Sequence, residues 1–97
     1  MIYHVLKKAD WENALQQGVY KPASLSTEGF IHASKATQVA GVLQRYFKNE
    51  KDLLLLHINE HALLEPFTYE FSESVNDEFP HIFGPMNLDA VINVEPI

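Results

Sequence analysis

The sequence contains no cysteine among its 97 residues. This absence excludes disulfide bonds and thiolate-ligated metal sites. Its longest apolar run, Leu53–Leu56, is far shorter than the roughly 20 residues that a membrane-spanning helix needs. The first residues also lack the basic-then-apolar layout of a secretory signal. We therefore expect a cytoplasmic location and no membrane partner.

Basic residues are scarce. Seven Lys and Arg stand against thirteen Asp and Glu, which gives a formal charge of −6, and the longest basic run is Lys7-Lys8. This balance argues against electrostatic binding to duplex DNA or to an anionic membrane surface. The sequence also lacks a G-x-G-x-x-G motif and a P-loop, which argues against a Rossmann-type or P-loop nucleotide site. A small nucleotide held by local groups remains compatible with this composition.

The residues that are present suit one folded domain, residues 1–97. A hydrophobic fraction of 46% and an aromatic fraction of 11% can supply an ordinary core. Period-two patterns and apolar runs predict strands, and period-3.6 patterns predict helices. We expect strands at 2–6, 53–58, 67–71 and 90–94, helices at 9–17 and 35–48, a brief strand at 19–20, a helical turn within 59–64, and at most a short strand within 79–85. This order predicts an α+β domain with two main helices on a mostly antiparallel or mixed sheet.

The stretch Gly29–Ser34, GFIHAS, is the most informative part of the chain. It reads as a strand that ends where the helix at 35–48 begins, with Ser34 as the N-cap. Free N–H groups at such a junction favour anions and polar ligands. His32 is then a site residue, or else a half-buried strand histidine bonded to backbone.

Each of the other four histidines has both a structural and a functional interpretation. His81 lies between two apolar residues in a proline-containing segment, where it anchors the loop or faces a ligand. His57 and His61 are four residues apart but fall on different elements, so we expect no metal site. His4 is either a packed strand residue or a ligand contact.

Glu70 is the carboxylate with most functional potential. Its position in the strand puts it on the face opposite the aromatic side chains of 67–71, and the simplest interpretation is that this face is exposed to solvent. If His32 or His81 lies nearby, Glu70 could orient an imidazole or bind ribose hydroxyls.

The motifs GFIHAS at 29–34 and FPHIFGPMNLDAV at 79–91, with Trp11 and the Tyr69-Glu70 pair, resemble a small bacterial family known as domain of unknown function 952. The resemblance spans essentially the whole chain. It implies a compact ADP-ribosyltransferase-like fold, a split sheet that elsewhere grips NAD.

Residue by residue, the resemblance implies ligand-binding roles for His4, His32 and Ser34 and catalytic roles for Glu70 and His81. Where the family pattern commonly has tyrosine after His-Ile, this chain has Phe83, which keeps a stacking ring without a hydroxyl. The implied function is binding of a nucleotide-like small molecule, NAD or ADP-ribose, in a His-lined cleft. The alternatives are an NAD-dependent ADP-ribosyltransferase or NAD glycohydrolase, and a non-catalytic scaffold. The sequence leaves the oligomeric state open.

Overall fold

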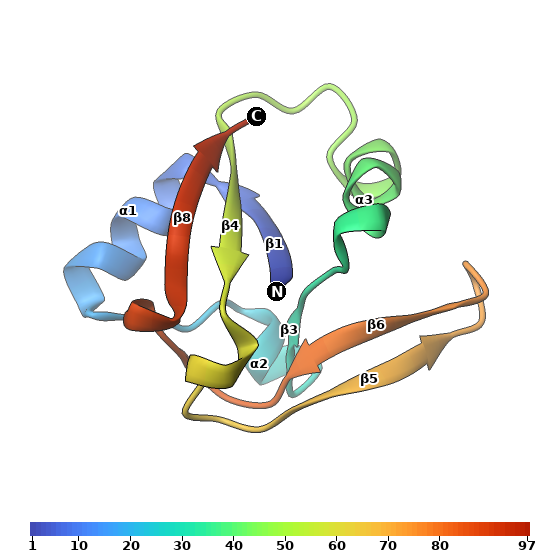
Figure 1. The fold of residues 1–97 in the computed structure, drawn as a ribbon. Helices are drawn as coiled ribbons and strands as arrows, with labels where there is room; N and C mark the ends of the chain where they lie inside the picture. Colours follow the sequence, from blue (N-terminus) through green and yellow to red (C-terminus); the bar gives the residue numbers. More distant parts are fainter.

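Three small antiparallel sheets make up the fold, which the computed structural model describes over the whole of residues 1–97 (Figure 1). The first sheet has the order β1 (Ile2–Lys7), β4 (Leu53–Ile58), β8 (Val91–Pro96). The second has the order β3 (Ile31–His32), β6 (Asp77–Ile82), β5 (Phe67–Ser72). The third pairs β2 (Val19–Tyr20) with β7 (Met86–Asn87). The α+β class is therefore confirmed, but the sheets are wholly antiparallel rather than mixed.

The helices are short. They are α1 (Lys8–Gln17), the single turn α2 (Ser24–Thr27) and α3 (Val39–Tyr46), with 3-10 turns at Ala36–Gln38, Glu60–Ala62 and Leu88–Ala90. Helix α1 ends as expected at Gly18, whose φ of 77° is a left-handed conformation that glycine adopts without strain. None of these helices has the length and apolar character needed to cross a membrane.

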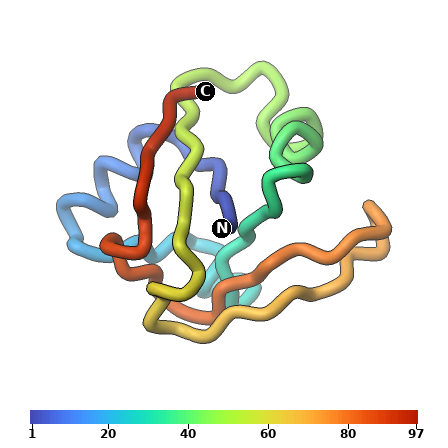
Figure 2. Tube along the Cα trace, viewed as in Figure 1, coloured from blue at the N-terminus to red at the C-terminus, as the bar shows by residue number.

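Strand β4 is buried on both faces because its side chains alternate between two apolar clusters. Leu54, Leu56 and Ile58 belong to the larger cluster, against which Trp11 of α1 packs. Leu53 and Leu55 belong to the smaller one, which α3 covers through Val39, Val42 and Leu43, together with Phe47 just after the helix end. The trace in Figure 2 shows the C-terminus beside the start of β4, where Ile97 N–H donates to the Leu53 carbonyl at 3.1 Å.

A four-residue run connects the two larger sheets. Ile31 and His32 pair with β6, and the Ala33 N–H donates to the Pro80 carbonyl at 3.0 Å. Ser34 then exchanges both backbone hydrogen bonds with Tyr3 of β1, at 2.7 and 2.8 Å. Residues 31–34 therefore hold the second sheet against the first.

The predicted N-cap role of Ser34 is wrong, because its backbone pairs with β1 instead. The residue that precedes the first helical turn is Lys35, whose N–H donates to the Gln38 side chain at 2.8 Å. The expected helix at 35–48 is a 3-10 turn followed by the shorter α3.

The prediction of at most a short strand within 79–85 is also wrong. Pro80 lies inside the six-residue strand β6, at the centre of the second sheet. Its carbonyl faces Ala33, so its missing N–H faces the same side, where β3 ends. The proline therefore removes one ladder hydrogen bond at the end of a two-residue strand, which the sheet tolerates.

Candidate functional site

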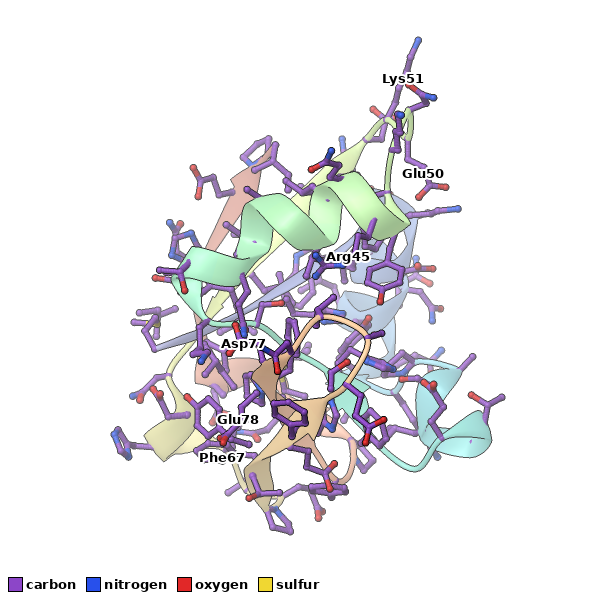
Figure 3. All side chains as sticks on the ribbon, turned by 90° about the vertical axis from the view of Figure 1, so that its right-hand side faces the viewer. Arg45, Glu50, Lys51, Phe67, Asp77 and Glu78 are labelled. Carbon is purple, nitrogen blue, oxygen red and sulfur yellow. The ribbon has the colours of Figure 1, made fainter.

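A cavity of about 580 Å³ lies where α3 and the β5–β6 hairpin meet the first sheet. Figure 3 shows the end of this hairpin, marked by Asp77, beneath α3. The polar lining residues are His4, Glu28, His32, Ser34, Ser72 and His81. The apolar lining residues are Val5, Ala33, Val42, Tyr46, Phe47, Phe71, Val75 and Phe79. We call this space the His-lined cavity.

His32 and His81 lie directly opposite one another on β3 and β6. Because the neighbouring pair, Ala33 and Pro80, carries the hydrogen bond, the histidine pair is of the non-hydrogen-bonded kind, in which side chains lie closest. The two ring centroids are 5.5 Å apart and the rings are nearly perpendicular, at 70°. Two residues 49 positions apart in the chain thus share one wall of the cavity.

Each of these imidazoles has one nitrogen bonded to a carboxylate. Nε2 of His32 donates to Glu28 at 2.5 Å, and Nδ1 of His81 donates to Glu70 at 2.6 Å. The ring of Phe30 stacks on His81, with centroids 4.0 Å apart and planes 15° apart. These contacts fix both ring orientations and leave the second nitrogen of each ring without a partner in the protein.

His4 is held differently. Its Nδ1 bonds the His32 carbonyl, which can only accept, so Nδ1 carries the proton. Its Nε2 must then accept from the Tyr20 hydroxyl, at 2.7 Å. Burial lowers the pKa of His4 to about 4, so the ring is neutral at physiological pH. Burial likewise raises the pKa of the Tyr20 phenol, which stays protonated as a donor.

The helix beside the cavity does not present its first N–H group as an anion site. The Lys35 N–H is taken by Oε1 of Gln38, whose Nε2 donates to Asp77 at 2.8 Å and to the Glu78 carbonyl at 2.7 Å. Gln38 is buried and fastens the start of α3 to β6. The hydrogen bond from Gln38, with smaller contributions from the Glu78 N–H and Lys35, lowers the pKa of the Asp77 carboxyl.

The structure brings four of the six sequence-predicted residues, His4, His32, Ser34 and His81, to the cavity wall. Glu70 reaches it only through its bond to His81. Phe83 is outside the lining and meets Phe30 edge-on, with centroids 6.0 Å apart. A ligand-stacking role for Phe83 therefore has no support from its position.

Sequence reasoning missed three residues of the site: Glu28, Tyr20 and Phe30. Glu28 is four residues before His32, a spacing that would have attracted notice only within a helix. Here the turn at Gly29, with φ of 87°, brings the two side chains together. Tyr20 contacts His4 from a different sheet, and Phe30 reaches His81 because the adjacent β3 pairs with β6, so neither contact has a local sequence signal.

The charges around the cavity limit its chemistry. No Lys or Arg lines it, and Glu28 adds negative charge. The structure contains no group of three or more His, Cys, Asp or Glu side chains arranged to hold a metal ion. The lining therefore offers imidazole and hydroxyl groups and one carboxylate, together with aromatic and aliphatic side chains.

The fold has close counterparts among solved structures. The crystal structure of protein CC0527 from Caulobacter crescentus superposes with a TM-score of 0.86 at 30% sequence identity, covering 96% of this chain and 82% of that one. The solution NMR structure of CC0527 gives a TM-score of 0.84 at 29% identity, covering 99% and 83%. Both are structural-genomics targets, and their descriptions name no activity.

No protein of curated function matches the chain significantly. A family model described as "Protein of unknown function (DUF952)" matches residues 5–94. This match, together with the likeness to CC0527 over nearly the whole length, places the chain in the DUF952 family.

Proposed function

We propose that the protein binds a nucleotide-like small molecule, of the NAD or ADP-ribose class, in the His-lined cavity. The observation that carries the proposal is the convergence of His32, His81 and Ser34 in one cavity whose other lining residues are mostly aromatic and aliphatic. Binding pockets for small molecules are mostly apolar, with a few placed polar groups, and span about 300–1,000 Å³. A cytoplasmic location, expected from the sequence, would give the cavity access to such ligands.

The lining residues suggest how the ligand would lie. A nucleobase or nicotinamide ring would contact the aromatic lining residues, among them Tyr46 and Phe79. Ribose hydroxyls would reach the free nitrogens of His32 and His81 and the hydroxyl of Ser34. Because the lining has no cationic side chain, affinity would come from the nucleoside part rather than from the phosphates.

A second candidate is NAD glycohydrolysis or ADP-ribosyl transfer on the ADP-ribosyltransferase-like plan. It is favoured by the presence of carboxylates at the site: Glu28 lines the cavity and Glu70 contacts His81. Cleaving the N-glycosidic bond builds positive charge on the ribose carbon, which a preorganised carboxylate stabilises. In that case purified protein would release nicotinamide from NAD, and Glu70→Gln would abolish the release.

Titration calorimetry and ¹H–¹⁵N spectra with NAD, ADP-ribose and adenosine test the binding proposal. We expect saturable shifts at residues 32, 34 and 81, and an affinity at least tenfold weaker in His32→Ala and His81→Ala. The matched control is His57→Ala, because His57 bonds Glu95 on the first sheet and lies outside the cavity. Absence of saturable binding by all three ligands, in a folded wild-type protein, would overturn the proposal.

A further inference from the structure

The two facing histidines, each backed by a carboxylate, carry an inference about chemistry. We propose that His32 and His81 form a metal-independent acid–base pair that hydrolyses a ribonucleoside cyclic phosphodiester. This proposal rests on the proposed function, since it takes the same cavity as its binding site.

The protonation pattern supports the pair. A carboxylate that accepts a hydrogen bond from one N–H of an imidazole fixes the tautomer and leaves the other ring nitrogen free to exchange a proton. Glu28 does this for His32 at 2.5 Å and Glu70 does it for His81 at 2.6 Å. The free nitrogens are then Nδ1 of His32 and Nε2 of His81. His4 cannot take part, because both of its nitrogens are already bonded.

Two separate imidazoles suit displacement at phosphorus better than acyl transfer. In acyl transfer one histidine serves in turn as base and acid. In an in-line displacement at phosphorus, the entering and leaving oxygens stand on opposite sides of the reacting atom, so two separate groups are needed. His32 and His81 are two separate imidazoles on neighbouring strands, with ring centroids 5.5 Å apart, so one can serve the entering oxygen and the other the leaving oxygen.

The charge of the cavity selects the substrate class. A cyclic phosphodiester carries a single negative charge, whereas a pyrophosphate carries two. With no Lys or Arg in the lining and a protein charge of −6, the singly charged group meets less electrostatic repulsion in this cavity. A ribonucleoside 2′,3′-cyclic monophosphate combines this charge with a base that can contact the aromatic and aliphatic lining residues.

The step balances without a cofactor. The neutral imidazole takes a proton from water as the water oxygen bonds to phosphorus. The bond from phosphorus to the ribose 2′ oxygen breaks, and the protonated imidazole gives its proton to that oxygen. The product is a nucleoside 3′-monophosphate, and exchange with solvent returns each histidine to its starting state.

The test follows hydrolysis of adenosine 2′,3′-cyclic monophosphate by ³¹P NMR, with EDTA present, while calorimetry measures binding of the same compound. We expect turnover that EDTA does not reduce. His32→Asn and His81→Asn should each lower kcat at least a hundredfold, a typical acid–base contribution. His57→Asn is the control, and it should keep wild-type turnover because His57 is outside the cavity.

Two variants test the carboxylates as positioning residues. Glu28→Gln and Glu70→Gln should lower kcat about tenfold or more with KM nearly unchanged, since they act through the imidazoles. The wild-type pH profile of kcat/KM should be bell-shaped, because the reaction needs one acid and one base. Three other ionisable groups contact this pair: Glu28 bonds His32, Glu70 bonds His81, and His4 bonds the His32 carbonyl.

The outcomes separate this inference from the proposed function. Binding of the cyclic nucleotide without hydrolysis, or hydrolysis that survives in both Asn variants, would overturn the acid–base pair and leave nucleotide binding standing. Neither binding nor hydrolysis of any nucleotide would overturn both.

Discussion

The hydroxyl of Tyr20 and Nε2 of His4 are joined by a 2.7 Å hydrogen bond between β2 and β1. Since the Nδ1 proton of His4 is committed to the His32 carbonyl, the Tyr20 hydroxyl must be the donor. Each of the three residues comes from a different sheet. This chain of bonds therefore fixes the position of β3, which carries His32 to the cavity.

Tyr20→Phe is expected to destabilise the protein by about 1–3 kcal/mol, because it leaves Nε2 of a half-buried imidazole without a partner. Urea unfolding at pH 7 measures the loss. The control is Tyr69→Phe, whose ring is 40% exposed and whose hydroxyl bonds nothing in the protein, so its effect should stay within about 0.5 kcal/mol. Equal losses in the two variants would contradict the role given to Tyr20.

His4 should make stability fall in mild acid. Its pKa drops from 6.5 to about 4 on folding, so the unfolded chain binds the proton more readily. The stabilisation is complete above pH 6.5 and is lost as the pH falls toward 4. The decrease in unfolding free energy from pH 7 to pH 5 should be about 2 kcal/mol larger in the wild type than in His4→Gln.

Urea titrations at the two pH values measure this difference. His61→Gln is the matched control, because that ring is exposed on a surface turn and should leave the wild-type decrease in place. If His4→Gln and the wild type lose stability to the same extent, folding does not lower the pKa of His4.

Gln38→Ala should loosen the hairpin against α3, since it removes hydrogen bonds to Asp77 and to the Glu78 carbonyl. We expect a loss of about 1–3 kcal/mol. Gln38→Glu should be worse at pH 7, because a carboxylate would face Asp77. Thermal unfolding compares the two with Gln44→Ala, an exposed position on the following helix α3 that should change little.

Because α3 and the hairpin both line the cavity, Gln38→Ala should also weaken ligand binding severalfold. Unchanged ligand affinity would indicate that the two elements keep their spacing without Gln38.

Leu56→Ala should cost about 2–5 kcal/mol, because Leu56 is fully buried in the central strand β4. Leu64→Ala is the control: this leucine is 81% exposed, so truncation should cost less than about 0.5 kcal/mol. Chemical denaturation of both variants measures the contrast.

The elements that could be predicted from sequence are those set by local pattern. The buried strand 53–58, the helix ending at Gly18 and the α+β class follow from apolar spacing and one glycine. Burial within an element was less predictable. Helical spacing puts Leu15 on one face of α1 with Trp11 and Ala14, yet Leu15 is 56% exposed, and Phe71, on the aromatic face of β5, is 59% exposed. Both depend on which partner element covers that face, which local spacing does not encode.

For the site, the sequence indicated individual residues but not the contacts between them. His32 and His81 attract attention through their residue type and their motifs, but their pairing depends on the register of β3 against β6. Proline normally argues against a central strand, so the sequence predicts only a short strand where the six-residue β6 lies. Glu28 was missed for a related reason: its contact with His32 needs the left-handed turn at Gly29.

The run from Ile31 to Ser34 is hydrogen-bonded to β6 at one end and to β1 at the other. Separating the two sheets would require breaking the backbone hydrogen bonds of Ser34 or of Ala33. A ligand should therefore find the cavity already formed and enter it by displacing water. Any structural adjustment should be confined to side chains and to the tip of the hairpin. Free and occupied forms of the protein should then superpose closely in their backbones.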